Sequence, residues 1–145
     1  WTPQIAIQCI RDMEPYHVAW VEQPVPRWDV DGLVRVREAV NTPISADESL
    51  GSIYDAMILA RRNAVDIVSV KLQKSEGFYK AKKIAAITEA ANIPIFMNSM
   101  IETGGSVAAS LQFAVSISNI IPYSAALMST LRLQDDILRV CAQIT

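Results

Sequence analysis

The chain has 145 residues, of which 51% are hydrophobic and 19% are charged, and its formal net charge at neutral pH is −2. These values are typical of one soluble globular domain or part of one. The basic residues form no cluster, which argues against a nucleic-acid-binding surface. No apolar run has the length of a membrane span, and the first residues do not resemble a secretion signal. We therefore expect a cytoplasmic protein without nucleic-acid or membrane partners, in which Cys9 and Cys141 are reduced and packed.

Helical and strand patterns alternate along the chain. Capping residues and prolines mark where the helices begin and end, and the strands are short apolar runs between them. The predicted helices span residues 2–13, 29 or 31 to 40, 52–62, 76–91 and a segment from about 104 to 118, followed by an amphipathic segment from about 134. The predicted strands span residues 17–22, 43–47, 65–74, 95–98 and 120–123.

The strand-plus-helix unit repeats about every 25 residues, which predicts right-handed crossovers and a parallel sheet. Either an open doubly wound sheet or a segment of a β/α barrel has this rhythm. A barrel gathers residues from many strand ends at one mouth, and the residues described next favour it. A complete barrel needs about 250 residues. We therefore expect residues 1–145 to form part of a TIM-type β/α barrel, about its second half.

One apolar strand carries a lysine at its carboxyl end. Alternation along the strand places Val68 and Val70 on one face and Ser69 and Lys71 on the other. A lysine beside so apolar a run needs a partner, because an unpaired buried ammonium is costly. Lys71 is therefore predicted to face the polar side of a covered sheet, whereas Lys74, at the start of the following loop, is expected to be solvated.

Two acidic residues stand at matching places on the preceding strands. Glu22 and Asp47 are 47 − 22 = 25 residues apart, and Asp47 and Lys71 are 71 − 47 = 24 residues apart. The three side chains should therefore meet at one end of three consecutive parallel strands. Carboxylates gathered at such a mouth suit Mg²⁺. Taken singly, either acid could instead be a strand-end or helix-capping residue.

The chemistry that such a group permits is proton transfer. A lysine desolvated by barrel walls and close to a metal ion loses preference for its charged form, and its neutral amine can act as a general base. Lys71 could then abstract a proton from the carbon next to a metal-bound carboxylate.

Three motifs at these spacings resemble the enolase superfamily, and within it the muconate cycloisomerase subgroup. They are Val21-Glu22-Gln23-Pro24, Ala46-Asp47-Glu48-Ser49 and Val70-Lys71-Leu72-Gln73-Lys74-Ser75. The resemblance implies that Glu22 and Asp47 are two of three Mg²⁺ ligands and that Lys71 is one of the acid/base lysines. It also implies abstraction of the proton α to a substrate carboxylate through an enediolate. The family's third ligand, its Lys-x-Lys pair and its capping domain are not among these residues.

The resemblance extends to the loop before the last long helix. Glu102 resembles an acidic residue that faces the substrate in this subgroup, although it could instead be a first-turn acid that favours the helix dipole. Gly104 opens a helix whose free backbone amides could receive an anion, and Ser99 begins the same loop. We therefore predict that Ser99, Glu102 and Gly104 contact substrate. The chain's single histidine, His17, stands at a strand start and is expected to be structural.

The leading hypothesis is a Mg²⁺-dependent racemase, epimerase, cycloisomerase or dehydratase. Its partner would be a small carboxylate substrate, such as an amino-acid derivative, and we expect a homo-oligomer. The alternative is a catalytically incompetent half-barrel that binds metal weakly through Glu22 and Asp47 or associates with itself through exposed strand edges. An open-sheet ligand-binding domain is a third possibility, but it does not explain three coincident motifs.

Overall fold

The computed structural model describes residues 1–129 and 132–137. Five strands form one parallel sheet, in which each strand pairs with the next one along the chain. The strands are β1 (Val21–Glu22), β2 (Ile44–Ala46), β3 (Ile67–Val70), β4 (Ile95–Asn98) and β5 (Ile120–Ala126). The helices are α1 (Pro3–Met13), α2 (Val30–Ala39), α3 (Ile53–Arg61), α4 (Phe78–Ala90) and α5 (Gly104–Ala114), with a short 3-10 helix, η1 (Glu14–Tyr16), after α1.

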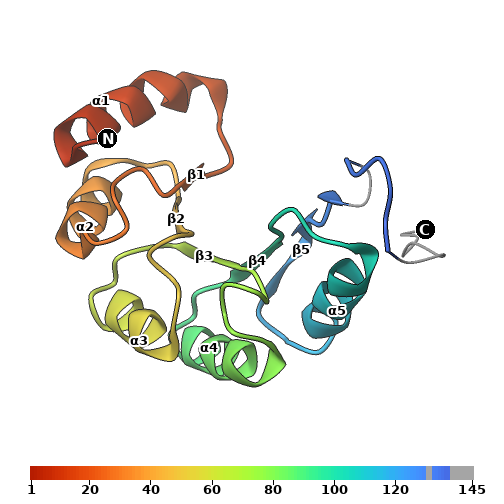
Figure 1. The fold of residues 1–145 in the computed structure, drawn as a ribbon. Helices are drawn as coiled ribbons and strands as arrows, with labels where there is room; N and C mark the ends of the chain where they lie inside the picture. The colour runs from red at the N-terminus through yellow and green to blue at the C-terminus, as the bar shows by residue number, and fades with distance from the viewer. Residues whose placement is uncertain (130–131, 138–145) are drawn as a thin grey trace.

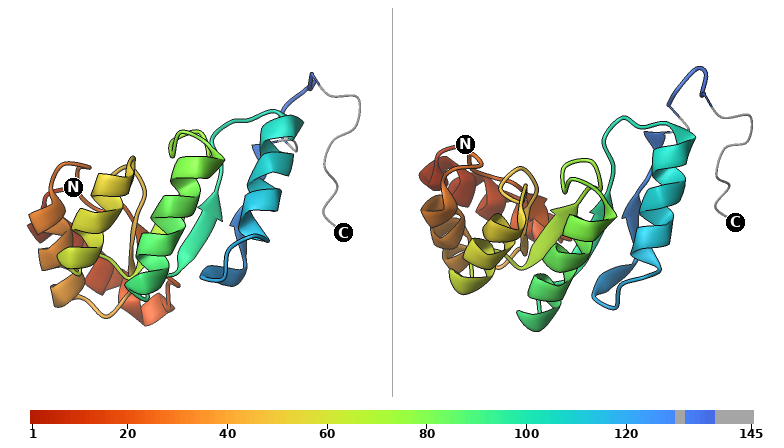
Figure 2. Two further views of the ribbon diagram at one scale, coloured as in Figure 1. Left: turned by 90° about the horizontal axis from the view of Figure 1, so that it is seen from below. Right: turned by 60° about the horizontal axis from the view of Figure 1, so that its bottom comes forward.

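The sheet is curved, and the helices lie on its convex side. Figure 1 shows α2 to α5 following one another around the outside of the arc, and Figure 2 shows each of α3, α4 and α5 lying along the neighbouring strands. An open doubly wound sheet has a point at which the strand order reverses, and this sheet has none. The chain is therefore a segment of a β/α barrel, which confirms the predicted fold class.

Side-chain caps fix where the helices begin. The Asp29 carboxylate accepts a hydrogen bond of 2.8 Å from the Gly32 amide at the start of α2. Ser52 accepts one from the Asp55 amide at the start of α3, and Thr2 does the same for α1, where Pro3 occupies the first turn. Each cap satisfies an amide that the helix cannot pair internally, as the sequence predicts for these residues.

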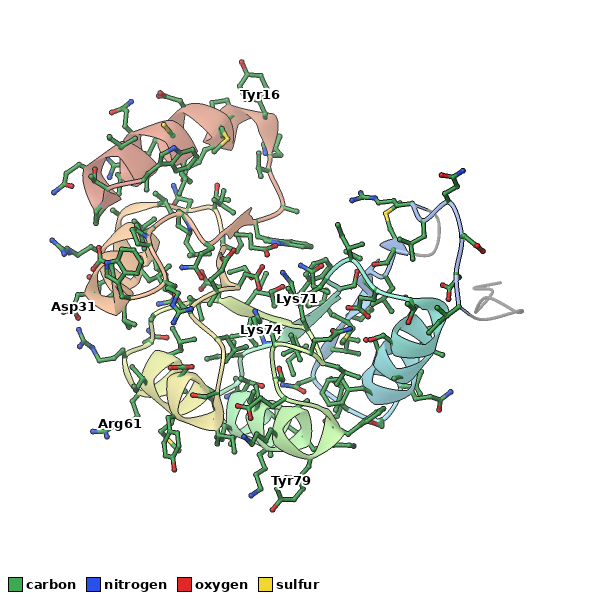
Figure 3. All side chains as sticks on the ribbon, in the orientation of Figure 1. Tyr16, Asp31, Arg61, Lys71, Lys74 and Tyr79 are labelled. Atoms are coloured by element: carbon green, nitrogen blue, oxygen red, sulfur yellow. The ribbon has the colours of Figure 1, made fainter. Side chains whose placement is uncertain are left out.

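The apolar core lies between the sheet and the helices. Val68 and Val70 in β3 and Ile95 in β4 are 0% exposed and belong to this core. The alternate residues Ser69 and Lys71 point to the concave side, which is the predicted division of the strand. Figure 3 shows Lys71 and Lys74 on the inner side of the arc and Arg61 and Tyr79 on its outer surface. The concave side therefore carries the polar groups available for chemistry.

Two predicted strands differ in length from the observed ones. The segment predicted as a strand from residue 17 begins only at Val21, because η1 and a left-handed His17 (φ 54°) turn the chain before it. The lysine strand was predicted to reach residue 74 but ends at Val70. The chain then turns sharply, and the Lys71 carbonyl accepts a hydrogen bond of 2.9 Å from the Ser75 amide.

The last elements also differ from the prediction. Helix α5 ends at Ala114 rather than near residue 118, because the Ser116 amide and hydroxyl both donate to the Phe113 carbonyl. Strand β5 continues to Ala126, beyond the predicted end at residue 123, and its pairing with β4 contains an irregularity. Most of the predicted segment from residue 134, and Cys141 with it, lies outside the described residues.

Two further expectations can be compared with the described part of the chain. Cys9 is a free thiol and is partly buried, as predicted for a packed residue. Among residues 1–129 and 132–137, no helix combines the length and the apolarity that crossing a membrane requires.

The contact between Gly32 and Asp29 leads to a prediction that opposes helix propensity. A Cβ atom at position 32 would overlap the Asp29 carboxylate, so Gly32→Ala should displace the cap of α2. Loss of a cap costs about 1 kcal/mol or more and outweighs the propensity gain at a first-turn position, so we expect net destabilisation of about 1 kcal/mol. Chemical denaturation measures it. Gly51→Ala is the control, since its nearest neighbour would lie at 3.5 Å; equal effects of the two substitutions would contradict this account.

Candidate active site

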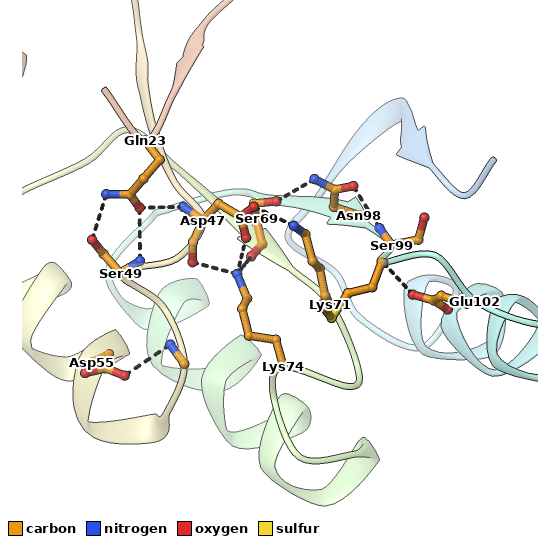
Figure 4. A network of polar contacts seen from close by, with 12 residues as sticks. Gln23, Asp47, Ser49, Asp55, Ser69, Lys71, Lys74, Asn98, Ser99 and Glu102 are labelled. Atoms are coloured by element: carbon orange, nitrogen blue, oxygen red, sulfur yellow. Dashed lines mark hydrogen bonds and ion pairs between the residues drawn. The ribbon is translucent and has the colours of Figure 1, made fainter. Parts of the chain in front are cut away.

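Three charged side chains meet at the carboxyl ends of neighbouring strands. Glu22 ends β1, Asp47 follows β2, and Lys71 follows β3. The ammonium nitrogen of Lys71 lies 2.5 Å from Asp47 Oδ2, forming an ion pair that Figure 4 shows spanning the two strand ends. Glu22 lies near enough to Asp47 for each carboxyl group to shift the pKa of the other. The structure therefore brings together the three residues that strand spacing predicts.

Lys74 is a fourth member of this group, and its predicted solvation is wrong. Its side chain is only 17% exposed, because the turn after β3 directs it back over the strand ends. The Lys74 ammonium group donates to Asp47 Oδ1, to the Asp47 carbonyl at 2.6 Å and to the Ser69 carbonyl at 3.2 Å. All three N–H groups of Lys74 are thus bonded to the protein. Lys74 therefore fixes the position of Asp47 relative to β3.

Lys71 differs from Lys74 in how its ammonium group is bound. Among the described residues, the hydrogen bond from Lys71 is the one to Asp47 Oδ2. Its side chain is 16% exposed, so it is shielded but keeps donors that the protein does not use. Lys71 is therefore the lysine of the pair whose nitrogen can change partners.

The surroundings shift the pKa values of Glu22 and Asp47 in opposite directions. Desolvation, the largest effect, and contact with Asp47 raise the pKa of Glu22 to about 7. Burial alone would raise the pKa of Asp47, but hydrogen bonds from Lys71 and Lys74 outweigh it, and the pKa of Asp47 is lowered. Burial also lowers the pKa of Lys74, although its pairing with Asp47 opposes this. Near neutral pH, Asp47 is therefore ionised, whereas the raised pKa leaves Glu22 partly protonated although its side chain is exposed at the strand end.

Gln23 positions the acidic residues, and the sequence analysis missed this role. Its Oε1 atom accepts hydrogen bonds from the amides of Asp47 and Ser49, both at 3.0 Å. Its Nε2 atom donates to Ser49 Oγ at 2.8 Å and to the Val25 carbonyl at 3.0 Å. One amide side chain thereby joins the loop after β1 to the loop after β2. The available signal was its position directly after Glu22, since an amide can both donate and accept.

The end of β4 continues this polar surface toward β5. The Asn98 side chain donates to Ser69 Oγ at 3.0 Å and accepts from the Ser99 amide at 2.8 Å. Ser99 Oγ donates to the Ala126 carbonyl at 2.7 Å, so this hydroxyl links β4 to the end of β5. The predicted contact of Ser99 with substrate stays a prediction.

The other two predicted substrate contacts lie further from Lys71 along the chain. Glu102 is 5% exposed, and its Oε1 atom accepts from the Met100 amide at 2.8 Å rather than capping α5. Its Oε2 atom is buried and has no hydrogen-bond partner among the described residues. The Gly104 amide, expected to be free for an anion, donates to Asp136 Oδ2 at 2.6 Å. The carboxylate of Asp136 therefore takes the place predicted for a substrate anion at this amide.

Aromatic residues follow two patterns. Trp20 and Phe96 pack against each other on the concave side, with ring centroids 5.1 Å apart. Trp28, in contrast, is 81% exposed. His17 is exposed and lies at the end of η1, apart from the strand ends that carry the acids and lysines.

Comparison with known proteins assigns the family. The model of the enolase C-terminal domain-like family matches residues 1–144. The chain belongs to this family. The match confirms the predicted enolase-superfamily membership and the placement in the C-terminal part of the barrel domain, and relatives named cycloisomerases support the muconate cycloisomerase subgroup.

Individual relatives are similar over most of this chain. It is 39% identical over 121 residues to the hydrophobic dipeptide epimerase of Enterococcus faecalis, which covers 83% of the chain and 34% of that protein. It is 30% identical over 142 residues to the chloromuconate cycloisomerase of Cupriavidus pinatubonensis, and this match covers 98% of the chain and 38% of that protein. A crystal structure of the Enterococcus faecalis dipeptide epimerase, complexed with Mg and the dipeptide L-Leu-L-Tyr, matches with a TM-score of 0.90 and 37% identity over 94% of this chain and 38% of that one. The chain spans about a third of the length of the relatives it matches.

The donor set of this enolase-family segment fits a hard divalent cation. Glu22 and Asp47 offer carboxylate oxygens, which Mg²⁺ prefers over nitrogen or sulfur ligands. The described residues contain no group of three Asp, Glu, His or Cys side chains able to hold one metal ion. Lys71 contacts Asp47 Oδ2 and Lys74 contacts Asp47 Oδ1, so a cation bound at Oδ2 would replace Lys71 and leave Lys74 in place.

The contacts of Lys74 predict an unusually large effect for a lysine substitution. Lys74→Met removes all three bonds and takes the Lys74 donor away from Asp47 Oδ1 and the Ser69 carbonyl, while the Asp47 carbonyl keeps its bond from the Leu50 amide, so we expect a loss of about 2 kcal/mol in the free energy of unfolding. The control is Lys80→Met, which breaks an exposed pair with Glu76 one helical turn away and should cost about 0.5 kcal/mol or less. Urea denaturation measures the free energy of unfolding of both variants. A loss in Lys74→Met no larger than that in Lys80→Met would contradict the structural role of Lys74.

The raised pKa of Glu22 predicts a pH dependence with a defined sign. Because its pKa in the folded, metal-free protein, about 7, lies above its ordinary value of 4.5, the folded state holds the Glu22 proton more tightly than the unfolded state. This contribution to stability is complete below pH 4.5 and is lost as pH rises through 7. The thermal midpoint in a chelator should therefore fall more steeply over this range in the wild type than in Glu22→Gln. Parallel profiles of the two proteins would contradict the assignment.

Proposed function

We propose that the protein carrying this chain uses Mg²⁺ to remove the proton α to a substrate carboxylate, leading to racemisation, epimerisation, cycloisomerisation or dehydration. The homologues are racemases, epimerases and cycloisomerases, which supports this general type of reaction. The observation that carries the proposal is the geometry of Lys71, whose shielded nitrogen lies against Asp47 at the carboxyl edge of the sheet. The crystal structure of a relative complexed with Mg supports the choice of cation.

Glu22 and Asp47 are the residues that would hold Mg²⁺, together with ligands beyond this set. Bound there, the cation would stabilise the negative charge that develops on the substrate carboxylate. Gln23 holds the Asp47 backbone amide and Lys74 holds its Oδ1 atom, whereas Oδ2 is bound by Lys71 alone among the described residues. The protein thus orients one oxygen of Asp47 before any ligand arrives.

Lys71 performs the proton transfer in this proposal. In the ion pair with Asp47 its nitrogen is an ammonium group, which cannot accept a proton. A cation held by Asp47 would compete with this ion pair, and the Lys71 ammonium would have to release one proton to solvent before its nitrogen could act as a base. Its neutral form takes the α-proton, the C–H bonding electrons remain with the substrate as an enediolate, and the resulting ammonium can return the proton.

Lys74 and Lys71 therefore have different roles despite their similar burial. Lys74 donates all of its N–H groups to the protein and is the positioning residue, whereas Lys71 is the acid/base residue. The small carboxylate substrate, the homo-oligomeric state and the cytoplasmic location remain proposals that follow from the family.

The test removes the Lys71 amine from the complete enzyme. Lys71→Ala should lower Mg²⁺-dependent exchange of the substrate α-proton with ²H₂O by at least about 100-fold on one face of the α-carbon. Exchange is followed by mass spectrometry or NMR, starting from each substrate enantiomer. Lys83→Ala is the control, since Lys83 is exposed on α4 and lies over the Tyr79 ring.

Two outcomes would count against the proposal. Exchange retained from both faces in Lys71→Ala would refute the role of Lys71. Absence of Mg²⁺-dependent exchange in the wild-type enzyme, combined with only weak Mg²⁺ binding by calorimetry, would favour the alternative of a catalytically incompetent metal-binding barrel segment. That alternative draws on the two-acid donor set among the described residues.

A further inference from the structure

Asn98 stands beside Lys71 at the carboxyl end of the next strand. The register of the sheet pairs Val70 of β3 with Met97 of β4, so Lys71 and Asn98 follow at the same level. Neighbouring strands lie about 4.8 Å apart, and side chains in register point to the same face of a parallel sheet. Figure 4 shows Asn98 on the side of Lys71 away from Asp47. The Lys71 side chain thus lies between an acid from one neighbouring strand and an amide from the other.

The amide group of Asn98 is fixed by two hydrogen bonds. Its Nδ2 atom donates to Ser69 Oγ at 3.0 Å, and its Oδ1 atom accepts from the Ser99 amide at 2.8 Å. Ser69 pairs with Phe96 in the sheet register, so the Asn98 side chain reaches diagonally from β4 to β3. Ser69 is 0% exposed and precedes Lys71 by two residues. The Asn98 amide therefore lies beside the base of the Lys71 side chain, on its β4 side.

Ser69 joins Asn98 to the hydrogen bonds that hold Asp47. The Lys74 ammonium group donates to the Ser69 carbonyl at 3.2 Å and to the Asp47 carbonyl at 2.6 Å. Gln23 Oε1 in turn accepts from the Asp47 amide at 3.0 Å. A connected network, which Figure 4 shows, therefore runs from the loop after β1 to the end of β4. We call Gln23, Asp47, Ser69, Lys74 and Asn98 the strand-end network.

Lys71 is bonded to the strand-end network at a single point. Among the described residues, its hydrogen bond is the one to Asp47 Oδ2, at 2.5 Å. That bond would be lost if Asp47 held a cation through the same oxygen. Lys71 would then be a flexible four-carbon chain without this anchor, and its direction would depend on the groups beside it. On the β4 side, the group beside it is the fixed amide of Asn98.

We propose that Asn98 is a positioning residue for Lys71, whose fixed amide closes the space toward β4 and keeps the Lys71 nitrogen over the ends of β2 and β3 during proton transfer. The inference rests on the proposed function, because Lys71 is the acid/base residue of that reaction. Asn98 itself neither gives nor takes the proton. A displaced Lys71 nitrogen reacts more slowly, because proton transfer depends on the distance and alignment between the base and the C–H bond. Loss of the Asn98 amide should therefore lower kcat and leave the binding of substrate and Mg²⁺ nearly unchanged.

The test replaces Asn98 in the complete enzyme and follows each face of the α-carbon separately. The probes are the L and D forms of N-acetylalanine, N-acetylphenylalanine and N-acetylglutamate, whose α-proton exchange in ²H₂O is measured by NMR with saturating Mg²⁺. The face that Lys71 serves is the one whose exchange is lost in Lys71→Ala. On that face, Asn98→Ala should lower kcat about tenfold. The KM, the Mg²⁺ dissociation constant measured by calorimetry and the exchange on the opposite face should each stay within about twofold.

Two further variants test the cause of this loss. Ser69→Ala removes the acceptor of the Asn98 amide but keeps Asn98, so kcat should fall less, about threefold, on the same face. Asn119→Ala is the matched control. Asn119 Nδ2 donates to Thr88 Oγ1 at 3.0 Å and to the Ile93 carbonyl at 3.1 Å, so it makes a similar pair of bonds at the opposite ends of β4 and β5. This control should leave kcat within about twofold on both faces.

Crystal structures of the Mg²⁺-bound wild type and Asn98→Ala give a readout that does not depend on activity. Lys71 should adopt one conformation in the wild-type enzyme. In the variant, its nitrogen should also be found in the space that the amide vacates toward β4.

The outcomes separate this inference from the proposed function. Equal losses of exchange on both faces, a loss confined to KM, an unchanged kcat or an unaltered Lys71 conformation in Asn98→Ala would each overturn the role of Asn98 and leave the reaction type intact. Exchange retained from both faces in Lys71→Ala, or no Mg²⁺-dependent exchange from any probe, would overturn the proposed function, and the inference with it.

Discussion

The arrangement of polar side chains on the concave face depends on how the Asp47 carboxylate is held in place. Asp47 follows a strand of three residues and is held from two directions, by Gln23 through its backbone amide and by Lys71 and Lys74 through its side chain. These contacts join three consecutive strand ends that backbone pairing alone would leave free to rotate about their last residues. An acid so placed keeps its charge at neutral pH, and this charge in turn keeps two lysines close to the sheet.

The division between the two faces of the sheet explains how such a group is tolerated. The helix-facing residues of the strands, such as Val68, Val70 and Ile95, are fully buried and supply the hydrophobic stabilisation of the arc. The concave face carries serines, acids and lysines that contribute little to that core and find partners mainly among themselves. Stability and chemistry are thus placed on opposite sides of the same short strands.

Much of this arrangement could be predicted from the sequence, because it follows from periodicity. Alternation along the strand fixed the direction of Lys71, and the spacing of about 25 residues placed Glu22 and Asp47 at its side. The predictions that were wrong or missing concern side chains whose direction depends on tertiary contacts. The direction of Lys74 depends on a turn after Val70, which no periodic pattern reports, and the role of Gln23 depends on two loops meeting in space. The Gly104 amide was predicted to be free because its partner, Asp136, is 32 residues away.

The bridging contacts are distributed unevenly around the arc. On the β1 to β3 side, Gln23 and Lys74 bond mainly to backbone atoms and to Asp47, so most changes there disturb the acid itself. On the β4 to β5 side, Ser99 and Ser129 hold the backbone, while Met100, Met128 and Arg132 project from it into open space. Substitutions can therefore accumulate on the second side without moving the first. In such a fold, the side chains that project into open space at the ends of β4 and β5 can change while those that hold Asp47, and with it the proposed proton-transfer site, stay in place.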